Sequence, residues 1–143
     1  MKNIIITASF LALFIFASCS ETETPDNNTT STNKSVNEII AGSNSKQWGL
    51  AKLYINDTLY PLTSEQLLYT KTYKRDSTFA DTDGLQGTYN FSSNGKYLSE
   101  TFTSGGSGNA IYSIISLTDK SLEYKLIYNG TDSLNTRFIF NAK

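Results

Sequence analysis

The stretch 121–128, Ser-Leu-Glu-Tyr-Lys-Leu-Ile-Tyr, places a large apolar or aromatic side chain at every second position. This period of two is typical of a half-buried β-strand, because successive side chains of a strand point to opposite faces. It is the cleanest single face in the chain, and it consists of Leu122, Tyr124, Leu126 and Tyr128. The stretch therefore predicts a strand that lies against an apolar core.

Similar strands are expected on both sides of this stretch, each separated from the next by residues that favour turns. After it, Asn129-Gly130-Thr131-Asp132 predicts a turn, and alternation returns along the last strand through Leu134, Thr136, Phe138 and Phe140. Before it, strands are expected over 110–118, 96–103 and 88–91. The Asn94-Gly95 pair predicts a two-residue hairpin turn of the primed type.

The first half of the region is less regular. Alternation over 48–54 predicts a strand that ends at the turn pair Asn56-Asp57, and Pro61 restricts the short return strand after it to an edge. Thr63 and Gln66 are placed to cap one helical turn, but the alternation over 67–79 favours a single long strand. Glu100 and Glu123 fall at strand positions that we assign to the solvent-facing side.

Together these strands predict an all-β domain over residues 45–143. It holds about seven or eight antiparallel strands in a meander, and no helix is long enough for a crossover connection. Closing such a meander into a small barrel hides its edge strands. A two-sheet β-sandwich is the alternative.

The N-terminus has the pattern of an export signal. Residues 1–18 carry one charged residue, Lys2, then an apolar or small run over 4–16 that is too short to cross a bilayer, and finally Ala17-Ser18 before Cys19. The residues at this boundary resemble the lipobox of bacterial lipoproteins. That resemblance implies cleavage before Cys19 and acylation of its thiol, so that lipid anchors the mature chain to a membrane. The alternative is ordinary secretory cleavage near Ala17, which leaves the only cysteine of the chain as a free thiol.

Residues 19–44 are expected to form a lipidated, flexible tether. They are rich in Ser, Thr, Asn and acidic residues, and no large apolar residue occurs before Val36, Ile39 and Ile40, where a single helical turn is conceivable. Glu21 and Glu23 resemble an acidic signal that sends some lipoproteins of Gram-negative bacteria to the cell surface. Ordinary linker charge explains them equally well, so a periplasmic and a surface orientation both stay open.

Composition argues against several classes of function. The chain has no His, and its one Cys is assigned to the lipid, so the usual metal ligands, the usual general base and a thiolate nucleophile are absent. Without residues 1–18, 11 Lys and Arg face 13 Asp and Glu, a net charge of −2 with no basic cluster, which disfavours nucleic acid. The Gly105–Gly108 loop lacks the ending of a phosphate-binding loop. We therefore expect no catalytic residues, no metal and no cofactor.

Three segments resemble the small lipocalin-like domains of outer-membrane lipoproteins in Gram-negative bacteria. They are Lys46-Gln47-Trp48-Gly49-Leu50, the stretch 88–97 (Thr-Tyr-Asn-Phe-Ser-Ser-Asn-Gly-Lys-Tyr) and the stretch 114–122 (Ile-Ile-Ser-Leu-Thr-Asp-Lys-Ser-Leu). The resemblance covers residues 45–143 and implies a lipid-anchored outer-membrane protein with a small barrel. It also implies that Trp48 packs at the closed barrel end beneath Arg137 from the last strand, as a cation–π pair.

Aromatic side chains are the candidate ligand-binding residues. Tyr112, Tyr124, Tyr128 and Phe138 are expected to line a cavity or to present a stacking surface to a small apolar molecule or a glycan. The alternative is that these rings only fill the core of a structural or protein-docking lipoprotein. Three Asp-Ser/Thr pairs, at 57–58, 76–77 and 132–133, resemble sites that some Gram-negative bacteria O-glycosylate after export.

Overall fold

The computed structural model describes residues 34–128 and 135–143, which form one helix, one 3₁₀ turn and nine strands. The helix α1 spans Val36–Ala41, and the 3₁₀ turn η1 spans Gln66–Leu68. The strands are β1 (Ser45–Ile55), β2 (Thr58–Tyr60), β3 (Thr70–Lys74), β4 (Thr78–Asp81), β5 (Gln86–Phe91), β6 (Tyr97–Ser104), β7 (Asn109–Leu117), β8 (Ser121–Tyr128) and β9 (Thr136–Ala142).

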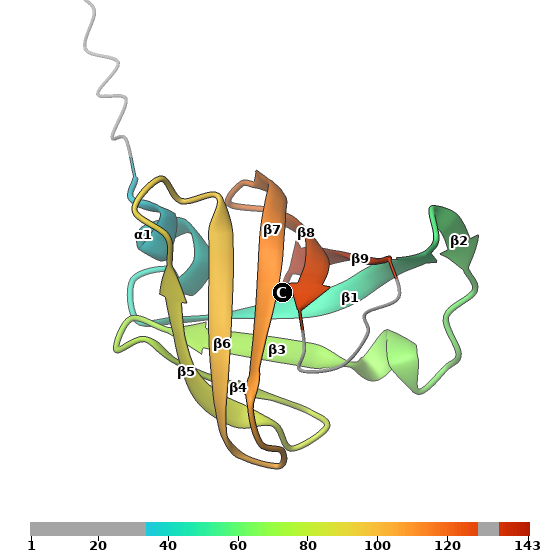
Figure 1. The fold of residues 1–143 in the computed structure, drawn as a ribbon, viewed down its shortest axis with the longest axis horizontal. Helices are drawn as coiled ribbons and strands as arrows, with labels where there is room; N and C mark the ends of the chain where they lie inside the picture. The colour runs from blue at the N-terminus through green and yellow to red at the C-terminus, as the bar shows by residue number, and fades with distance from the viewer. Residues whose placement is uncertain (1–33, 129–134) are drawn as a thin grey trace, which may run out of the picture. The chain divides into compact units, whose positions relative to one another are not determined.

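The strands form a closed antiparallel barrel of eight strands, with β2 as an additional strand (Figure 1). From β3 to β9 each strand pairs with the next along the chain, and β1 pairs with both β3 and β9 to close the ring. The first half of β1 pairs with β3, and its last three residues pair with β2. The expected all-β meander and its closure into a small barrel are confirmed, and the sandwich alternative is not what the chain forms.

The expected single strand over 67–79 was wrong. Reciprocal hydrogen bonds of the capping-box kind form the turn that leads into η1. The Thr63 hydroxyl accepts from the Gln66 backbone N–H at 3.2 Å, and the Gln66 side chain accepts from the Thr63 N–H at 3.0 Å. A turn then separates β3 from β4: Asp76 accepts hydrogen bonds from the backbone and hydroxyl of Thr78, and Ser77 adopts a φ of 66°. Local side-chain hydrogen bonds therefore outweigh the alternation.

The two predicted tight turns differ from one another. Asn56 and Asp57 have φ values of 51° and 62°, as a two-residue primed turn requires. The turn around Gly95 is wider than expected, since the Ser92 N–H donates to the Tyr97 carbonyl across four intervening residues. In this turn the Asn94 side chain accepts hydrogen bonds from the Ser92 hydroxyl and the Lys96 N–H, which stabilises the larger loop.

The folded domain begins before residue 45, which moves the expected boundary of the tether. Ser35 caps α1 through a capping box with Glu38, and Ile40 and Ala41 are completely buried. The buried indole of Trp48 donates a hydrogen bond to the Ile40 carbonyl at 2.8 Å. The helix therefore covers one end of the barrel, and Ile40 and Ala41 belong to the core.

The half of the barrel nearest α1 is filled by side chains. Trp48, Tyr73, Leu122, Tyr124 and Phe140 pack together there with no room for a water molecule between them. Tyr73 and Tyr89 meet edge to face, with their ring centroids 5.0 Å apart. This end of the barrel is therefore closed.

Candidate functional site

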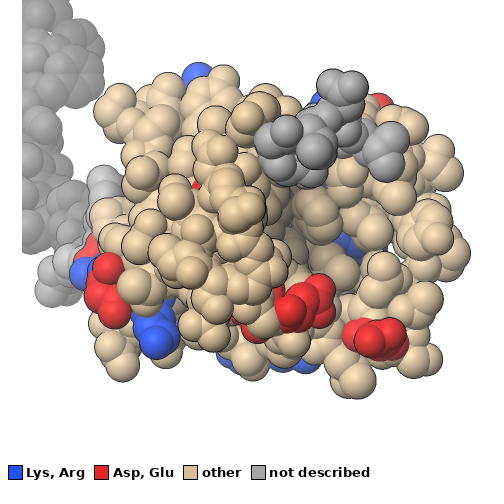
Figure 2. All heavy atoms as spheres, turned by 60° about the horizontal axis from the view of Figure 1, so that its bottom comes forward, with Lys and Arg blue, Asp and Glu red and all other residues tan. Residues whose placement is uncertain are grey.

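A cavity of about 410 Å³ lies in the other half of the barrel and opens to solvent. Its lining comes from β1, β3, β7, β8 and β9, from the segment around η1, and from the turn between β4 and β5. Figure 1 shows α1 and η1 at opposite ends of the domain, and Figure 2 shows a hollowed face with acidic side chains at its edge. The lining residues are Leu50, Leu53, Glu65, Gln66, Tyr69, Lys71, Asp83, Leu85, Tyr112, Tyr124, Phe138 and Phe140.

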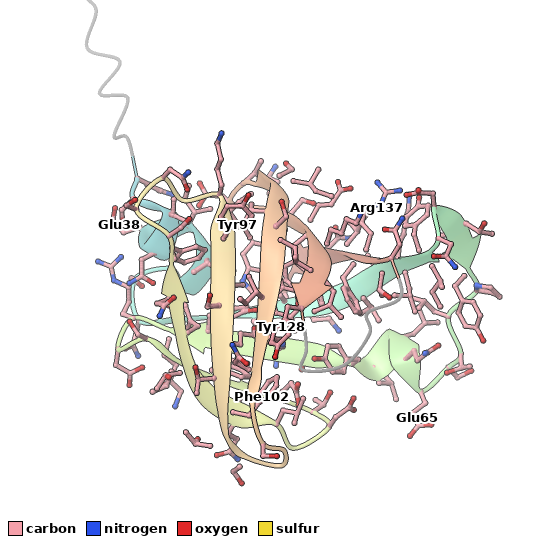
Figure 3. All side chains as sticks on the ribbon, viewed as in Figure 1. Glu38, Glu65, Tyr97, Phe102, Tyr128 and Arg137 are labelled. Atoms are coloured by element: carbon pink, nitrogen blue, oxygen red, sulfur yellow. The ribbon has the colours of Figure 1, made fainter. Side chains whose placement is uncertain are left out.

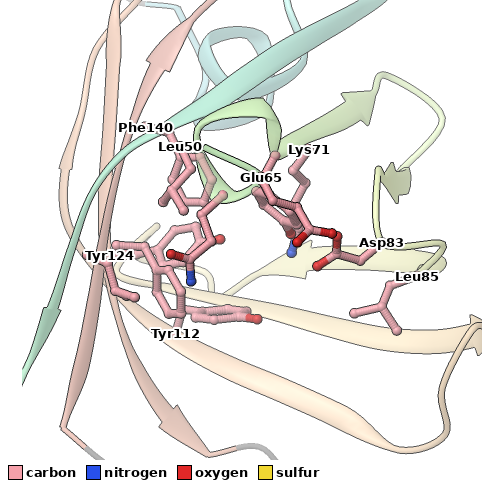
Figure 4. Close-up of a pocket in the computed structure, with 12 residues that line it drawn as sticks. Leu50, Glu65, Lys71, Asp83, Leu85, Tyr112, Tyr124 and Phe140 are labelled. Carbon is pink, nitrogen blue, oxygen red and sulfur yellow. The ribbon is translucent and has the colours of Figure 1, made fainter. Parts of the chain in front are cut away.

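The walls of the cavity are mainly aliphatic and aromatic. The rings of Tyr112 and Tyr124 have centroids 4.4 Å apart, and Tyr124 and Phe138 are 5.6 Å apart. Leu50 and Leu85 face the cavity from opposite walls (Figure 4). Apolar walls of this kind favour an apolar molecule, because they remove its surface from water.

Lys71 forms the polar floor of the cavity and is held there by a buried ion pair with Glu100. The Lys71 ammonium donates to both carboxylate oxygens of Glu100, at 3.1 and 2.8 Å, and Lys71 itself lines the cavity. Lys71 is 3% exposed and Glu100 is completely buried. Two buried charges of opposite sign offset part of each other's desolvation cost, provided that hydrogen bonds engage the remaining oxygen lone pairs.

Two tyrosine hydroxyls complete the coordination of Glu100. Tyr73 donates to Oε1 at 2.5 Å and Tyr112 donates to Oε2 at 3.3 Å. Burial raises the pKa of both hydroxyls, and the neighbouring Glu100 charge raises it further. Both tyrosines therefore stay protonated at neutral pH and act as hydrogen-bond donors to the carboxylate.

The rim of the cavity carries acidic side chains. The Tyr69 hydroxyl donates to Asp81 at 2.9 Å, and burial followed by the Asp81 charge raises the pKa of Tyr69. The other carboxylate oxygen of Asp81 accepts from the backbone N–H groups of Asp83 and Leu85, which fixes the β4–β5 turn. Glu65 and Asp83 are exposed and face one another across the entrance (Figure 4).

The structure brings three of the four predicted ligand-binding residues to the cavity. Tyr112, Tyr124 and Phe138 line it, whereas Tyr128 is 46% exposed and is absent from the lining. Figure 3 shows Tyr128 at the end of β8. The register between β7 and β8 shifts between Ile111 and Tyr112, opposite the end of β8. The alternating face that begins at Leu122 therefore does not continue inward to Tyr128.

The expected barrel-end pair of Trp48 and Arg137 is not formed. The cation over the Trp48 ring is Lys46, with its Nζ 4.4 Å from the ring centroid. The Arg137 guanidinium lies 4.1 Å from the ring of Tyr54, its cross-strand partner on β1. Figure 3 shows Arg137 at the opposite end of the domain from α1, because Trp48 pairs with the far end of β9.

The buried ion pair was missed in the sequence, and our assignment of Glu100 to the solvent-facing side was wrong. Glu100 lies two residues from Leu98 and two from Phe102, so it shares their inward face on β6. Lys71 likewise lies between Tyr69 and Tyr73 on one face of the chain. We assigned Glu100 to the solvent-facing side because it is charged. The alternating positions of the neighbouring apolar residues indicate instead that Lys71 and Glu100 both face inward.

Several predicted features lie outside the described residues: Cys19, the signal over 1–18, and the Asp132-Ser133 pair. The Asp57-Thr58 and Asp76-Ser77 pairs each lie at a turn between strands. Within residues 34–128 and 135–143, no group of His, Cys, Asp and Glu is arranged to hold a metal ion, and no helix has the length and apolar character needed to span a bilayer. Comparison with protein families, curated proteins and solved structures finds no match to this chain.

Proposed function

We propose that this protein is a lipid-anchored outer-membrane lipoprotein whose non-catalytic, lipocalin-like barrel binds a small, largely apolar ligand. The observation that carries the proposal is the asymmetric interior: side chains fill the half beside α1, and the other half holds an open cavity of about 410 Å³. Binding sites for small molecules typically measure about 300–1,000 Å³ and combine apolar walls with a few polar groups. The cavity fits both criteria.

The polar groups of the floor support binding rather than catalysis. Both oxygens of Glu100 already accept hydrogen bonds from Lys71 and from a tyrosine. A general base needs a free lone pair within reach of the proton it removes. Glu100 is thus engaged in holding Lys71 and the tyrosines in place, and it is not positioned to accept a proton from a ligand.

Acylation of Cys19 supplies the membrane attachment in this proposal. Since the folded domain already includes residue 34, about 15 residues separate it from the lipid, and a flexible linker of that length has a r.m.s. span of roughly 20 Å. Two or three acyl chains hold such a protein durably at a bilayer. The barrel would then work close to the membrane surface, on either the periplasmic or the outer side.

Native mass spectrometry of the full chain, purified from membranes in mild detergent, tests the binding function. We expect a non-covalent adduct that is lost in Leu85→Trp, because the larger ring fills the entrance of the cavity. Ile115→Trp is the matched control, since Ile115 is 51% exposed and does not line the cavity. A wild-type mass that equals polypeptide, lipid and any covalent glycan, with no adduct, argues against a ligand-binding role.

A docking function is the second candidate, and an exposed apolar patch favours it. Leu59, Tyr60, Leu67 and Leu68 are 47–73% exposed, and three of them line a shallow groove beside β2. Isolated apolar side chains are common on protein surfaces, but a cluster of them is typical of interaction sites. If this patch is the functional surface, the double variant Leu59→Ser with Leu67→Ser abolishes the docking of a protein partner, and Leu85→Trp leaves that docking intact.

A further inference from the structure

We propose that the cavity selects an uncharged ligand whose polar end is a hydrogen-bond acceptor for Lys71, and that it rejects anionic ligands such as fatty-acid carboxylates. This inference rests on the proposed binding function and names the chemistry of the ligand. Its basis is the buried pair of Lys71 and Glu100 at the floor of the cavity.

The hydrogen bonds already formed at the floor determine which ligand group can bind there. An ammonium has three N–H donors, and a carboxylate accepts about four hydrogen bonds. Glu100 accepts two from Lys71, one from Tyr73 and one from Tyr112, so its capacity is used. The Lys71 ammonium contacts both oxygens of Glu100, and among the described residues no other oxygen accepts a hydrogen bond from it. Its Nζ also lies over the rings of Phe79 and Tyr112, 5.1 and 5.7 Å from their centroids. At least one of its three N–H groups therefore has no oxygen acceptor. The floor therefore offers an N–H donor to a ligand, and the Glu100 carboxylate has no acceptor position left for one.

The charge of Lys71 does not make the floor attractive to anions. A ligand carboxylate in contact with Lys71 would also lie beside Glu100, whose negative charge is completely buried and is not screened by water. The attraction of one buried charge is thus largely offset by the repulsion of the other. An anion would lose its hydration without gaining a net opposite charge. A neutral carbonyl, amide or hydroxyl oxygen loses much less hydration and still accepts the free N–H.

The apolar walls of the cavity add a second requirement, which is that the rest of the ligand is apolar. Beside Lys71, the cavity is bounded by Leu50, Tyr112, Tyr124 and Phe140 (Figure 4). The Lys71 Nζ lies 5.7 Å from the centroid of the Tyr112 ring, so a flat group that stacks on this ring brings its polar end next to the ammonium. The geometry therefore points to an apolar or aromatic body with one neutral acceptor at its inner end.

A pair of probes that differ in charge but hardly in shape tests the inference. We would titrate the full chain with 2-naphthamide and 2-naphthoate near neutral pH, where the carboxylate is ionised, and measure binding by calorimetry and by saturation-transfer NMR. We expect 2-naphthamide to bind at least about tenfold more tightly. Equal affinities, or tighter binding of the naphthoate, overturn the inference and leave the binding function standing. If neither probe binds, the proposed function itself is contradicted.

Two variants locate the source of the selectivity. In Glu100→Gln, Lys71 loses its counter-charge while the cavity keeps its shape, so we expect the preference to reverse toward 2-naphthoate. In the control Glu65→Gln with Asp83→Asn, the rim loses its charge and the floor is unchanged, so the preference for the amide should persist. Loss of the preference in this rim control would assign the selectivity to the entrance and overturn the inference, even if Glu100→Gln were to fold poorly.

Discussion

Glu100→Gln is the substitution that tests the buried ion pair most stringently. It replaces a carboxylate by an amide of nearly the same size, and it leaves the Lys71 ammonium, which is 3% exposed, without a counter-charge. Breaking a buried pair by neutralising one partner typically costs about 3–5 kcal/mol. Small domains have a free energy of unfolding of about 5–15 kcal/mol, so the variant is expected to fold with much lower stability.

Two further variants separate the cost of the unpaired Lys71 charge from the other effects of the substitution. In Lys71→Met with Glu100→Gln both charges are gone, and we expect a cost below about 2 kcal/mol, because an apolar side chain replaces the ammonium. Glu123→Gln is the matched control, since Glu123 also forms a 2.8 Å ion pair, with Arg137, but both partners are partly exposed. Its cost should stay below about 1 kcal/mol.

Urea unfolding, followed by the fluorescence of the single Trp48, measures all three variants. The slope of free energy against urea concentration should stay constant, so that differences in midpoint report stability alone. If Glu100→Gln costs no more than Glu123→Gln, or if the double variant is less stable than Glu100→Gln alone, the charges of Lys71 and Glu100 do not stabilise each other.

Three further predictions concern the fold and its anchor. Gly87→Ala should lower the free energy of unfolding, measured by thermal denaturation, by at least about 3 kcal/mol, because its Cβ would lie 1.9 Å from the Thr101 carbonyl oxygen. In the control Gly84→Ala the new Cβ meets nothing within 4 Å, and the φ of 88° alone should cost about 1 kcal/mol. Similar costs for the two variants would contradict the close packing of β5 on β6. Burial raises the pKa of Tyr73, Tyr112 and Tyr124, so the unfolded chain loses these protons at lower pH than the folded one. The free energy of unfolding should therefore fall above about pH 10, by about 1.4 kcal/mol per pH unit for each of these tyrosines. A free energy of unfolding that is flat between about pH 9 and pH 11 would contradict their burial. Cys19→Ala should move the protein from the membrane to the soluble fraction on ultracentrifugation, and continued membrane association would exclude acylation as the anchor.

The strand pattern of the sequence was sufficient to predict the barrel, because alternation reports directly which side of a strand faces the core. It was insufficient where local hydrogen bonds compete with alternation. The capping interactions of Thr63 and the turn at Asp76 divide the expected strand over 67–79, and they depend on side-chain geometry that a hydropathy pattern does not contain. The helix α1 is only six residues long, and its place in the core becomes apparent only when Trp48 is seen to bind Ile40.

The residues of the candidate site were predicted only in part, because alternation shows which side of a strand faces the core but not which side chains meet. Aromatic residues on regular strands, such as Tyr112 and Tyr124, were placed in the interior by parity alone. Lys71 and Glu100 were not, because a buried charge is acceptable only with its partner, and the two lie 29 positions apart in the sequence. They are on β3 and β6, which do not pair with each other. Parity indicates that each side chain faces inward, but no local pattern shows that the two side chains meet.

Intermolecular nuclear Overhauser effects are the decisive measurement of whether the cavity holds an apolar ligand with its polar end at Lys71. With 2-naphthamide bound to the full chain, we predict contacts from the naphthalene protons to the rings of Tyr112, Tyr124 and Phe138, with the amide end next to the Lys71 side chain. Contacts confined to the exposed residues Leu59, Leu67 and Leu68, with none to the cavity rings, would contradict the claim.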